Sequence, residues 1–246
     1  MMGKRRLCTI ILAAGKGTRM KSDLAKVLHP ICGKPMLAYP VAVAREAGSE
    51  KIAVIVGHQA SLVRETFKDE GLIFVEQREQ LGTGHAVLQA RESFRDDDGT
   101  VLILCGDVPL LRSSTARALL AYHVSEKAMV TVLTVLRENP SGYGRVVKGE
   151  KGEVLRIVEE RDATEEEKKI REINSGTYCV ESKFLFEAVA EIGRENAQGE
   201  YYLTDIVEIA CRKGLPVRSF IVAEADEVMG INTPDDLKHA GRLVTT

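Results

Sequence analysis

The sequence predicts an α/β protein in which helices flank both faces of a mixed, mostly parallel sheet. Short apolar runs alternate with amphipathic stretches through the first half of the chain, and this alternation is typical of strands joined by crossover helices. The 246 residues, of which 44% are hydrophobic and 28% charged, are enough for one large α/β domain or two small ones. Such sheets bind ligands beyond the carboxyl ends of their strands.

The first half supplies four expected strands, each followed by an expected helix. The first apolar run, 7–13, is predicted to be a buried strand. A helix over 35–47 would begin with a proline, which the first helical turn tolerates, and a helix over 113–123 has Ser113 as its expected cap. The other expected strands are 52–56, 72–75 and 101–104, and the other expected helices are 59–67 and 83–94.

From about residue 128 the chain becomes richer in β-branched residues. We expect it to add strands to the same sheet and to close one side of the cleft. The charged run 164–169 is interpreted as a solvated helix face. Because no low-complexity linker interrupts the chain, residues 1–246 are predicted to form one domain of two lobes. The expected strands are 129–136, 144–147, 154–158, 174–180, 217–222 and 228–231, and the expected helices are 183–192, 204–212 and 234–243.

Charge and cysteine content exclude several classes of protein. The net charge of −2 and isoelectric point of about 6.3 leave no global basic field for nucleic acid. The five cysteines are odd in number and form no Cys-x-x-Cys pair, which argues against a disulfide framework or a structural zinc site. The apolar run 7–14 is too short to span a membrane and lacks a cleavage site, so we expect a cytoplasmic protein without a membrane partner.

The loop Leu12–Met20 follows the first expected strand and is rich in features that suit an anion. Gly15 and Gly17 allow backbone N–H groups to approach a phosphate, and a lysine and an arginine add positive charge. A P-loop is excluded, because Ile10 stands where its first glycine would be. A dinucleotide fingerprint is excluded as well, because Met20 replaces its third glycine. Taken alone, the two glycines fit an ordinary strand–helix turn equally well.

The string Leu-Ala-Ala-Gly-Lys-Gly-Thr-Arg-Met at 12–20, followed by Lys26 in Ala-Lys-Val-Leu-His-Pro, resembles the signature of nucleotidyltransferases that activate sugar phosphates. The chain is most similar to the N-terminal uridyltransferase domain of the bifunctional N-acetylglucosamine-1-phosphate uridyltransferase/glucosamine-1-phosphate acetyltransferase, with the motifs in the same order over roughly 7–243. The resemblance implies a Rossmann-like nucleotide-diphospho-sugar transferase fold, with a nucleotide-binding lobe at about 1–127 and a sugar-binding lobe at about 128–246. It also implies Mg²⁺-dependent transfer of UMP from UTP to N-acetylglucosamine 1-phosphate.

The resemblance assigns the nucleotide side of the reaction to three motifs. Arg19 and Lys26 are the expected catalytic cations, which neutralise the triphosphate. Asp107, in Cys-Gly-Asp, and Asn232 are the expected protein ligands of Mg²⁺. His85 is given no catalytic role. The expected nucleotide-binding residues are Leu12, Ala13, Ala14, Gly15, Gly17, Thr18, Gln77, Gly82 and Thr83, of which Gln77, Gly82 and Thr83 would read the uracil edge.

The sugar side is assigned to the second half of the chain, and two positions depart from the family pattern. Cys105 replaces the commoner tyrosine before Gly-Asp, which removes any contact made by that ring. Thr233 follows Asn232, as in nucleotidyltransferases for other sugars, where the favoured relative usually continues with a second asparagine. The expected sugar-binding residues are Gly144, Glu159, Asn174, Tyr202 and Thr204.

Other functions stay open at the level of sequence. The substrate could be another sugar 1-phosphate, such as glucose 1-phosphate, with UTP or dTTP as the nucleotide. A non-catalytic nucleotide-sensing homologue is disfavoured because Arg19, Lys26 and Asp107 are all present. A dinucleotide-binding oxidoreductase would need the missing third glycine. The chain carries no hexapeptide repeat of a left-handed β-helix domain, so we expect no acetyltransferase activity. The oligomeric state is not predicted.

Overall fold

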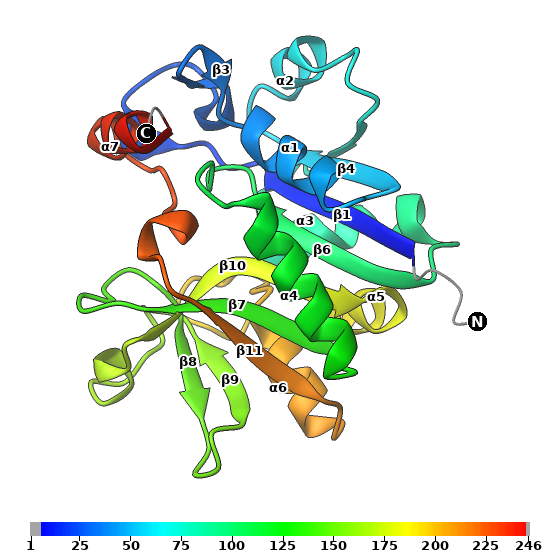
Figure 1. Cartoon of the computed structure of the whole chain (residues 1–246), viewed down its shortest axis with the longest axis vertical. Coiled ribbons are helices and arrows are strands. Elements are labelled where there is room, and N and C mark those ends of the chain that lie inside the picture. The colour runs from blue at the N-terminus through cyan, green and yellow to red at the C-terminus, as the bar shows by residue number, and fades with distance from the viewer. Residues whose placement is uncertain (1–5, 245–246) are drawn as a thin grey trace.

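A computed structural model describes residues 6–244, and these residues form a sheet with helices on both sides (Figure 1). The described part of the chain contributes nine strands to this sheet. Their bounds are β1 (Arg6–Ala13), β4 (Lys51–Val56), β5 (Ile73–Glu76), β6 (Gly99–Cys105), β7 (Val130–Leu136), β8 (Arg145–Lys148), β9 (Val154–Val158), β10 (Glu172–Glu181) and β11 (Val217–Val222). The main path runs β11-β7-β10-β6-β1-β4-β5, and β8 and β9 join it through β10.

The middle strand β10 joins the two halves of the chain into one sheet. Strands β6, β1, β4 and β5 are parallel to one another, and β11 is parallel to β7. Strand β10 runs antiparallel to both β6 and β7. The second half therefore adds strands to the same sheet, and the predicted mixed, mostly parallel α/β fold is confirmed.

Two hydrophobic layers cover the faces of the sheet. Because successive side chains of a strand point to opposite faces, Ile10 packs into one layer and its neighbour Ile11 into the other, and both are fully buried. The first layer includes α3 (Thr83–Gln89), α5 (Ser182–Glu191) and α6 (Asp205–Arg212). The second includes α1 (Ala38–Glu46), α2 (Ala60–Thr66) and α4 (Ser113–Ser125). Burial on both faces explains why β1 is a continuous apolar run.

The last helix, α7 (Pro234–Val244), does not cover the sheet. It packs against the small hairpin of β2 (Pro30–Ile31) and β3 (Lys34–Pro35), as Figure 1 shows at the upper left. A separate apolar cluster holds this contact together. The chain thus returns from its second half to the first, and the segment before α7 lies beside loops that are far away in sequence.

Four sequence expectations about local structure are wrong. The helix expected over 35–47 begins only at Ala38, because Lys34–Pro35 pair with Pro30–Ile31 in the hairpin. The helix expected over 83–94 ends at Gln89 and is followed by a 3₁₀ turn. The charged run 164–169 forms only a 3₁₀ turn at its end. Ser113 is the first residue of α4 and not its cap, and no side chain caps this helix.

The strand expected over 228–231 is also wrong. This apolar segment does not pair with the sheet, because the backbone N–H of Ile231 donates to the carbonyl of Asp107 at 2.8 Å. A 3₁₀ turn, Ala225–Val228, precedes it.

Within residues 6–244, no helix has the length and apolar character needed to cross a lipid bilayer.

Candidate active site

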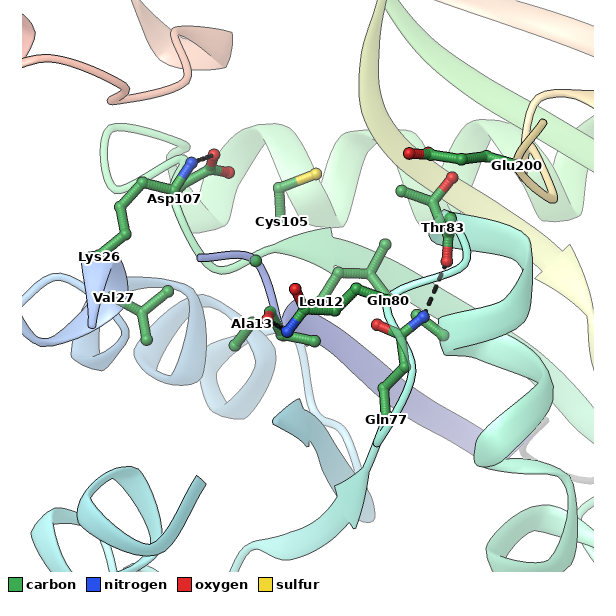
Figure 2. A pocket seen from close by; sticks show the side chains of 14 residues that line it. Leu12, Ala13, Lys26, Val27, Gln77, Gln80, Thr83, Cys105, Asp107 and Glu200 are labelled. Carbon is green, nitrogen blue, oxygen red and sulfur yellow. Dashed lines mark hydrogen bonds and ion pairs between the residues drawn. The ribbon is translucent and has the colours of Figure 1, made fainter. Parts of the chain in front are cut away.

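A cavity of about 310 Å³ lies at the carboxyl ends of β1, β5 and β6. The chain leaving β1 forms one wall with Leu12, Ala13, Ala14 and Gly15. The chain after β5 and the start of α3 contribute Gln77, Gln80, Gly82 and Thr83, and the chain around the end of β6 contributes Cys105 and Asp107. Figure 2 shows Lys26 and Asp107 at one end of this cavity and Gln77 with Thr83 at the other. Most of the predicted nucleotide-binding residues therefore share one cavity.

The glycine loop is shaped by its contact with Lys26. Gly17 has a backbone φ of +64°, and a Cβ there would lie 2.6 Å from the Cβ of Lys26. A side chain at Gly17 would displace the lysine, so glycine is required for this close approach. Open space surrounds the Cβ position of Gly15, which leaves its backbone accessible. Gly17 and Thr18 lie in the loop beside the cavity but do not line it.

Four side chains from distant parts of the sequence meet next to this loop. The Nζ of Lys26 forms an ion pair with Asp107 and donates to Oδ1 of Asn232 at 3.1 Å. The Nη2 of Arg19 donates to the same Asn232 oxygen at 3.0 Å. The side chains of Lys26 and Asp107 are only 12% and 24% exposed, so little solvent screens their attraction. The structure thus brings together the two predicted cations and the two predicted metal ligands.

The position of Asn232 is set by the start of α7. The carboxylate of Asp236 accepts hydrogen bonds from the N–H groups of Asn232 and Thr233 at 2.9 and 2.8 Å. In return, the N–H of Asp236 donates to Oγ1 of Thr233 at 3.2 Å, which completes a capping box. Although burial alone would raise it, these hydrogen bonds hold the pKa of Asp236 below its ordinary value. Thr233, one of the departures from the family pattern, therefore has a local structural role.

The oxygen pair of Asp107 and Asn232 is suited to a hard divalent cation. Both side chains direct an oxygen to one positive charge, the Nζ of Lys26. Carboxylate and amide oxygens are the ligands that Mg²⁺ accepts, usually together with water and substrate phosphates. Within the described range 6–244, no cluster of three or more His, Cys, Asp or Glu side chains could hold a metal without such help.

The far end of the cavity is tied to the second half of the chain. The backbone of Tyr201 lies directly over Gly82, where a Cβ would be 2.5 Å from the Tyr201 oxygen. The N–H of Gly84 donates to that oxygen at 2.8 Å, and the N–H of Leu203 donates to Oγ1 of Thr83 at 3.1 Å. Gly82 is thus glycine because of a chain crossing, and the hydroxyl hydrogen of Thr83 is left to donate elsewhere.

Four of the five predicted sugar-binding residues form a second cluster. The N–H of Asn174 donates to the carbonyl of Gly144 at 2.9 Å, and a Cβ at Gly144 would lie 3.5 Å from Oε2 of Glu159. Oγ1 of Thr204 donates to Oε1 of Glu159 at 3.1 Å. Burial raises the pKa of Glu159, and nearby carboxylates add to this although the Thr204 hydrogen bond opposes it. The cluster combines a carboxylate, a hydroxyl and an amide around a position without a side chain.

Tyr202, the fifth predicted sugar-binding residue, is held differently. Its hydroxyl donates to Asp162 at 3.1 Å and accepts from Nε2 of Gln198 at 2.9 Å. Its side chain lines a neighbouring hollow together with Glu159. The structure places Tyr202 next to the second cluster, and its hydroxyl is already hydrogen-bonded on both sides.

Cys105 lines the cavity and contacts β10. Its Sγ lies 3.5 Å from the carbonyl of Gly176 in β10, and a Cβ at Gly176 would be 2.7 Å from this sulfur. Burial, aided by the charge of Asp107, raises the pKa of the Cys105 thiol to about 12. The raised pKa favours the neutral thiol, which is a weaker nucleophile than the thiolate.

Sequence reasoning missed three residues that shape the cavity. Gln80 donates from Nε2 to the carbonyl of Ala14 at 3.1 Å, and Glu200 faces the cavity from the second half of the chain. Gln59 holds the loop before Lys26, since its amide bonds the carbonyl of Asp23 and the N–H of Ala25, each at 2.7 Å. Gln80 and Glu200 lie within motifs that were recognised, but nothing in the sequence indicates the contacts of Gln59.

Comparison with known proteins agrees with this geometry. The chain is 55% identical to the bifunctional protein GlmU of Geobacter metallireducens over 238 residues, which are 96% of this chain and 50% of that protein. It is 54% identical to GlmU of Geobacter sulfurreducens over 96% of the chain and 50% of the relative. For GlmU of Clostridioides difficile the identity is 47%, over 96% of the chain and 51% of the relative. The chain thus spans about half the length of the curated relatives it matches.

The family model described as nucleotidyl transferase matches residues 8–226, which include every residue of the two clusters except Asn232. This match covers most of the chain, from β1 to the 3₁₀ turn at Ala225–Val228. The chain belongs to the nucleotidyl transferase family.

Proposed function

We propose that this chain transfers UMP from UTP to N-acetylglucosamine 1-phosphate, producing UDP-N-acetylglucosamine and pyrophosphate. The observation that carries the proposal is the meeting of Arg19, Lys26, Asp107 and Asn232 beside the glycine loop. A reaction between two phosphates must overcome the repulsion of like charges. Two cations and a pair of metal-binding oxygens at one end of a nucleotide-sized cavity are suited to that task.

The cavity suggests how the nucleotide lies. We infer that the triphosphate follows the loop from Gly15 to Arg19, because the open backbone and the cations are there. The base then extends toward Gln77 and Thr83, which lie at the other end of the same cavity. The hydroxyl of Thr83 can donate a hydrogen bond because its oxygen already accepts one from Leu203. The Gln77 amide oxygen can accept a hydrogen bond from a pyrimidine edge.

The second cluster supports an N-acetylated sugar as the other substrate. Asn174 and Glu159 supply an amide and a carboxylate that can bind the acetamide group and the sugar hydroxyls, and glycine at Gly144 keeps a side chain away from the Glu159 carboxylate, which would be 3.5 Å from a Cβ there. In the proposed reaction an oxygen of the sugar phosphate attacks the α-phosphorus, and the bond to the β-phosphate oxygen breaks. No proton must be removed from the attacking phosphate, so the contribution of the protein is positioning and charge neutralisation by Lys26 and Arg19.

A bound Mg²⁺ would supply further neutralisation of the phosphates, and Asp107 and Asn232 are the residues that would hold it. Lys26 contacts both of these oxygens, so the lysine is close enough to act on the same phosphate groups. The similarity to proteins named GlmU and the sequence motifs together favour N-acetylglucosamine 1-phosphate over glucose 1-phosphate.

The free state of all five cysteines supports a cytoplasmic location.

The proposal is tested by measuring pyrophosphate release with UTP, dTTP, CTP and ATP, each combined with several sugar 1-phosphates and Mg²⁺. The wild-type chain should be most active with UTP and N-acetylglucosamine 1-phosphate. Asp107→Asn should reduce turnover about 10²- to 10³-fold, a loss typical of a group that stabilises transition-state charge. The same substitution at the exposed Asp98, which pairs with Lys183, serves as the control. Near wild-type turnover in Asp107→Asn would exclude the assigned role of this carboxylate.

A further inference from the structure

The side-chain amide of Gln77 is held in one orientation at the base end of the cavity. Gln77 is only 3% exposed. Its Nε2 lies 3.0 Å from the carbonyl oxygen of Gly82 and 3.1 Å from Nδ1 of His85. An amide nitrogen carries two hydrogens, so these two neighbours use both of them. In Figure 2 a dashed hydrogen bond leaves the amide nitrogen of Gln77 and the amide oxygen lies on the opposite side, and Gln77 lines the cavity.

The same contacts determine which nitrogen of His85 carries the proton. Nε2 of His85 lies 3.0 Å from the amide of Gln89, so each ring nitrogen faces a glutamine. A neutral imidazole has one N–H and one acceptor nitrogen. If Nδ1 carried the proton, Gln77 would have to turn its oxygen toward His85, and this oxygen would then face the Gly82 carbonyl. The Gly82 carbonyl therefore favours the tautomer of His85 in which Nδ1 is an acceptor and Nε2 carries the proton.

Gln89 can adapt to this arrangement more easily than Gln77. Rotation of the Gln89 amide by 180° presents an oxygen to the Nε2–H of His85 and gives up the 3.2 Å hydrogen bond from Gln89 Nε2 to the His85 carbonyl. Because Gln89 is half-buried on α3, water can replace that bond, whereas Gln77 is only 3% exposed and its contacts have no such replacement. The His85 ring is itself held in place, since it stacks on Tyr201 with ring centroids 6.0 Å apart and planes inclined by 28°. His85 thus connects the second half of the chain to the amide that faces the base.

We propose that His85 is a positioning residue that makes the cavity select uracil over cytosine. The inference rests on the proposed function, in which Gln77 faces the base. With both amide hydrogens held by Gly82 and His85, Gln77 presents only its oxygen to the ligand. Uracil offers a ring N–H to such an acceptor, whereas the corresponding nitrogen of cytosine is itself an acceptor and would be repelled. His85 does not contact the base in this arrangement but acts through Gln77.

The experiment compares kcat/KM for UTP and CTP in the wild-type chain and in two variants, with N-acetylglucosamine 1-phosphate as acceptor. His85→Phe keeps a ring against Tyr201 but removes the acceptor for Gln77. It should reduce the UTP-to-CTP ratio about five- to tenfold, as expected for the loss of one hydrogen bond. Gln89→Leu is the matched control, because it contacts the other ring nitrogen and not Gln77. Its ratio should stay close to that of the wild type.

Two outcomes would overturn the proposal while leaving the proposed function intact: an unchanged ratio in His85→Phe, or an equal loss in Gln89→Leu. If the wild-type chain forms no product with any nucleotide, the proposed function fails and this inference fails with it. The tautomer is measured independently by ¹⁵N NMR of the wild-type chain, which distinguishes protonated from bare ring nitrogens and does not depend on turnover. A bare Nδ1 in His85 is expected, and a protonated Nδ1 with a bare Nε2 would contradict the mechanism.

Discussion

The backbone of Tyr201 crosses close to Gly82, and from this contact we predict how much the variant Gly82→Ala loses in free energy of unfolding. Gly82 has φ of +109° and ψ of 173°, a conformation found almost only in glycine. A Cβ at this position would lie 2.5 Å from the oxygen and 2.8 Å from the nitrogen of Tyr201. Both atoms are backbone, so they cannot rotate away as a side chain could. Either the start of α3 or the segment around Tyr201 must move.

The expected loss of stability has two parts. Holding alanine in this backbone conformation costs about 1–3 kcal/mol. Forcing an extra methyl group into a packed contact costs about 1–3 kcal/mol more. The displacement also threatens two hydrogen bonds, from Tyr201 N–H to the Leu81 carbonyl and from Gly84 N–H to the Tyr201 carbonyl, both of 2.8 Å. We therefore expect Gly82→Ala to lower the free energy of unfolding by about 2–6 kcal/mol.

The assay is urea unfolding without nucleotide, so that loss of ligand binding does not contribute. Gly71→Ala is the matched control, because Gly71 also has a positive φ, of +64°, but nothing lies within 4 Å of its Cβ position. This control isolates the cost of a left-handed backbone, which is about 1–2 kcal/mol. If Gly82→Ala destabilises the protein no more than Gly71→Ala, the close approach of Tyr201 is not what requires glycine at Gly82.

Two further predictions concern buried charge. Burial, and after it the charge of neighbouring carboxylates, raises the pKa of the Asp205 carboxyl to about 6. The folded chain therefore binds the carboxyl proton more tightly than the unfolded chain does. The stability that this proton contributes is lost as the pH rises through 6. The melting temperature of Asp205→Asn should accordingly increase relative to wild type between pH 4.5 and pH 7, and a constant difference would contradict the shift. The guanidinium of Arg145 is 2% exposed and pairs with Glu160 at 2.6 Å, so Glu160→Gln should leave a buried charge unpaired and destabilise the chain by about 2–3 kcal/mol in chemical unfolding. Glu50→Gln, at an exposed ion pair, should cost less than about 1 kcal/mol, and equal losses at the two sites would refute the effect of burial.

Much of the fold follows from local pattern in the sequence. The apolar run of β1 is continuous because both faces of the strand are buried, and its neighbours in the sheet have the same character. The predicted bounds of these strands differ from the observed bounds by at most two residues at either end. The errors arose where tertiary contacts compete with local pattern. Residues 228–231 have the composition of a strand, but the N–H of Ile231 donates to Asp107 in the loop after β6 and does not pair with a strand of the sheet.

The candidate site divides in the same way. Glycines after a strand, two nearby cations and an Asp after a buried strand are local features, and they indicated a phosphate site before any contact was known. The proximity of Asn232 to Lys26 is not local, because it depends on the packing of α7 against the hairpin of β2 and β3. The contacts of Gln59 with the loop before Lys26 are equally invisible in sequence.

By itself, the sequence determined the class of fold, the strands that bear the site and the residue types that suit phosphate chemistry, because periodicity and turn residues act over a few neighbouring positions. Only the tertiary structure decided which distant groups meet, since those contacts depend on how helices and loops pack across the sheet. Gly82 illustrates the difference: the family resemblance assigns this residue to the base, and the folded chain adds a reason for glycine that no local pattern shows, the close approach of the Tyr201 backbone.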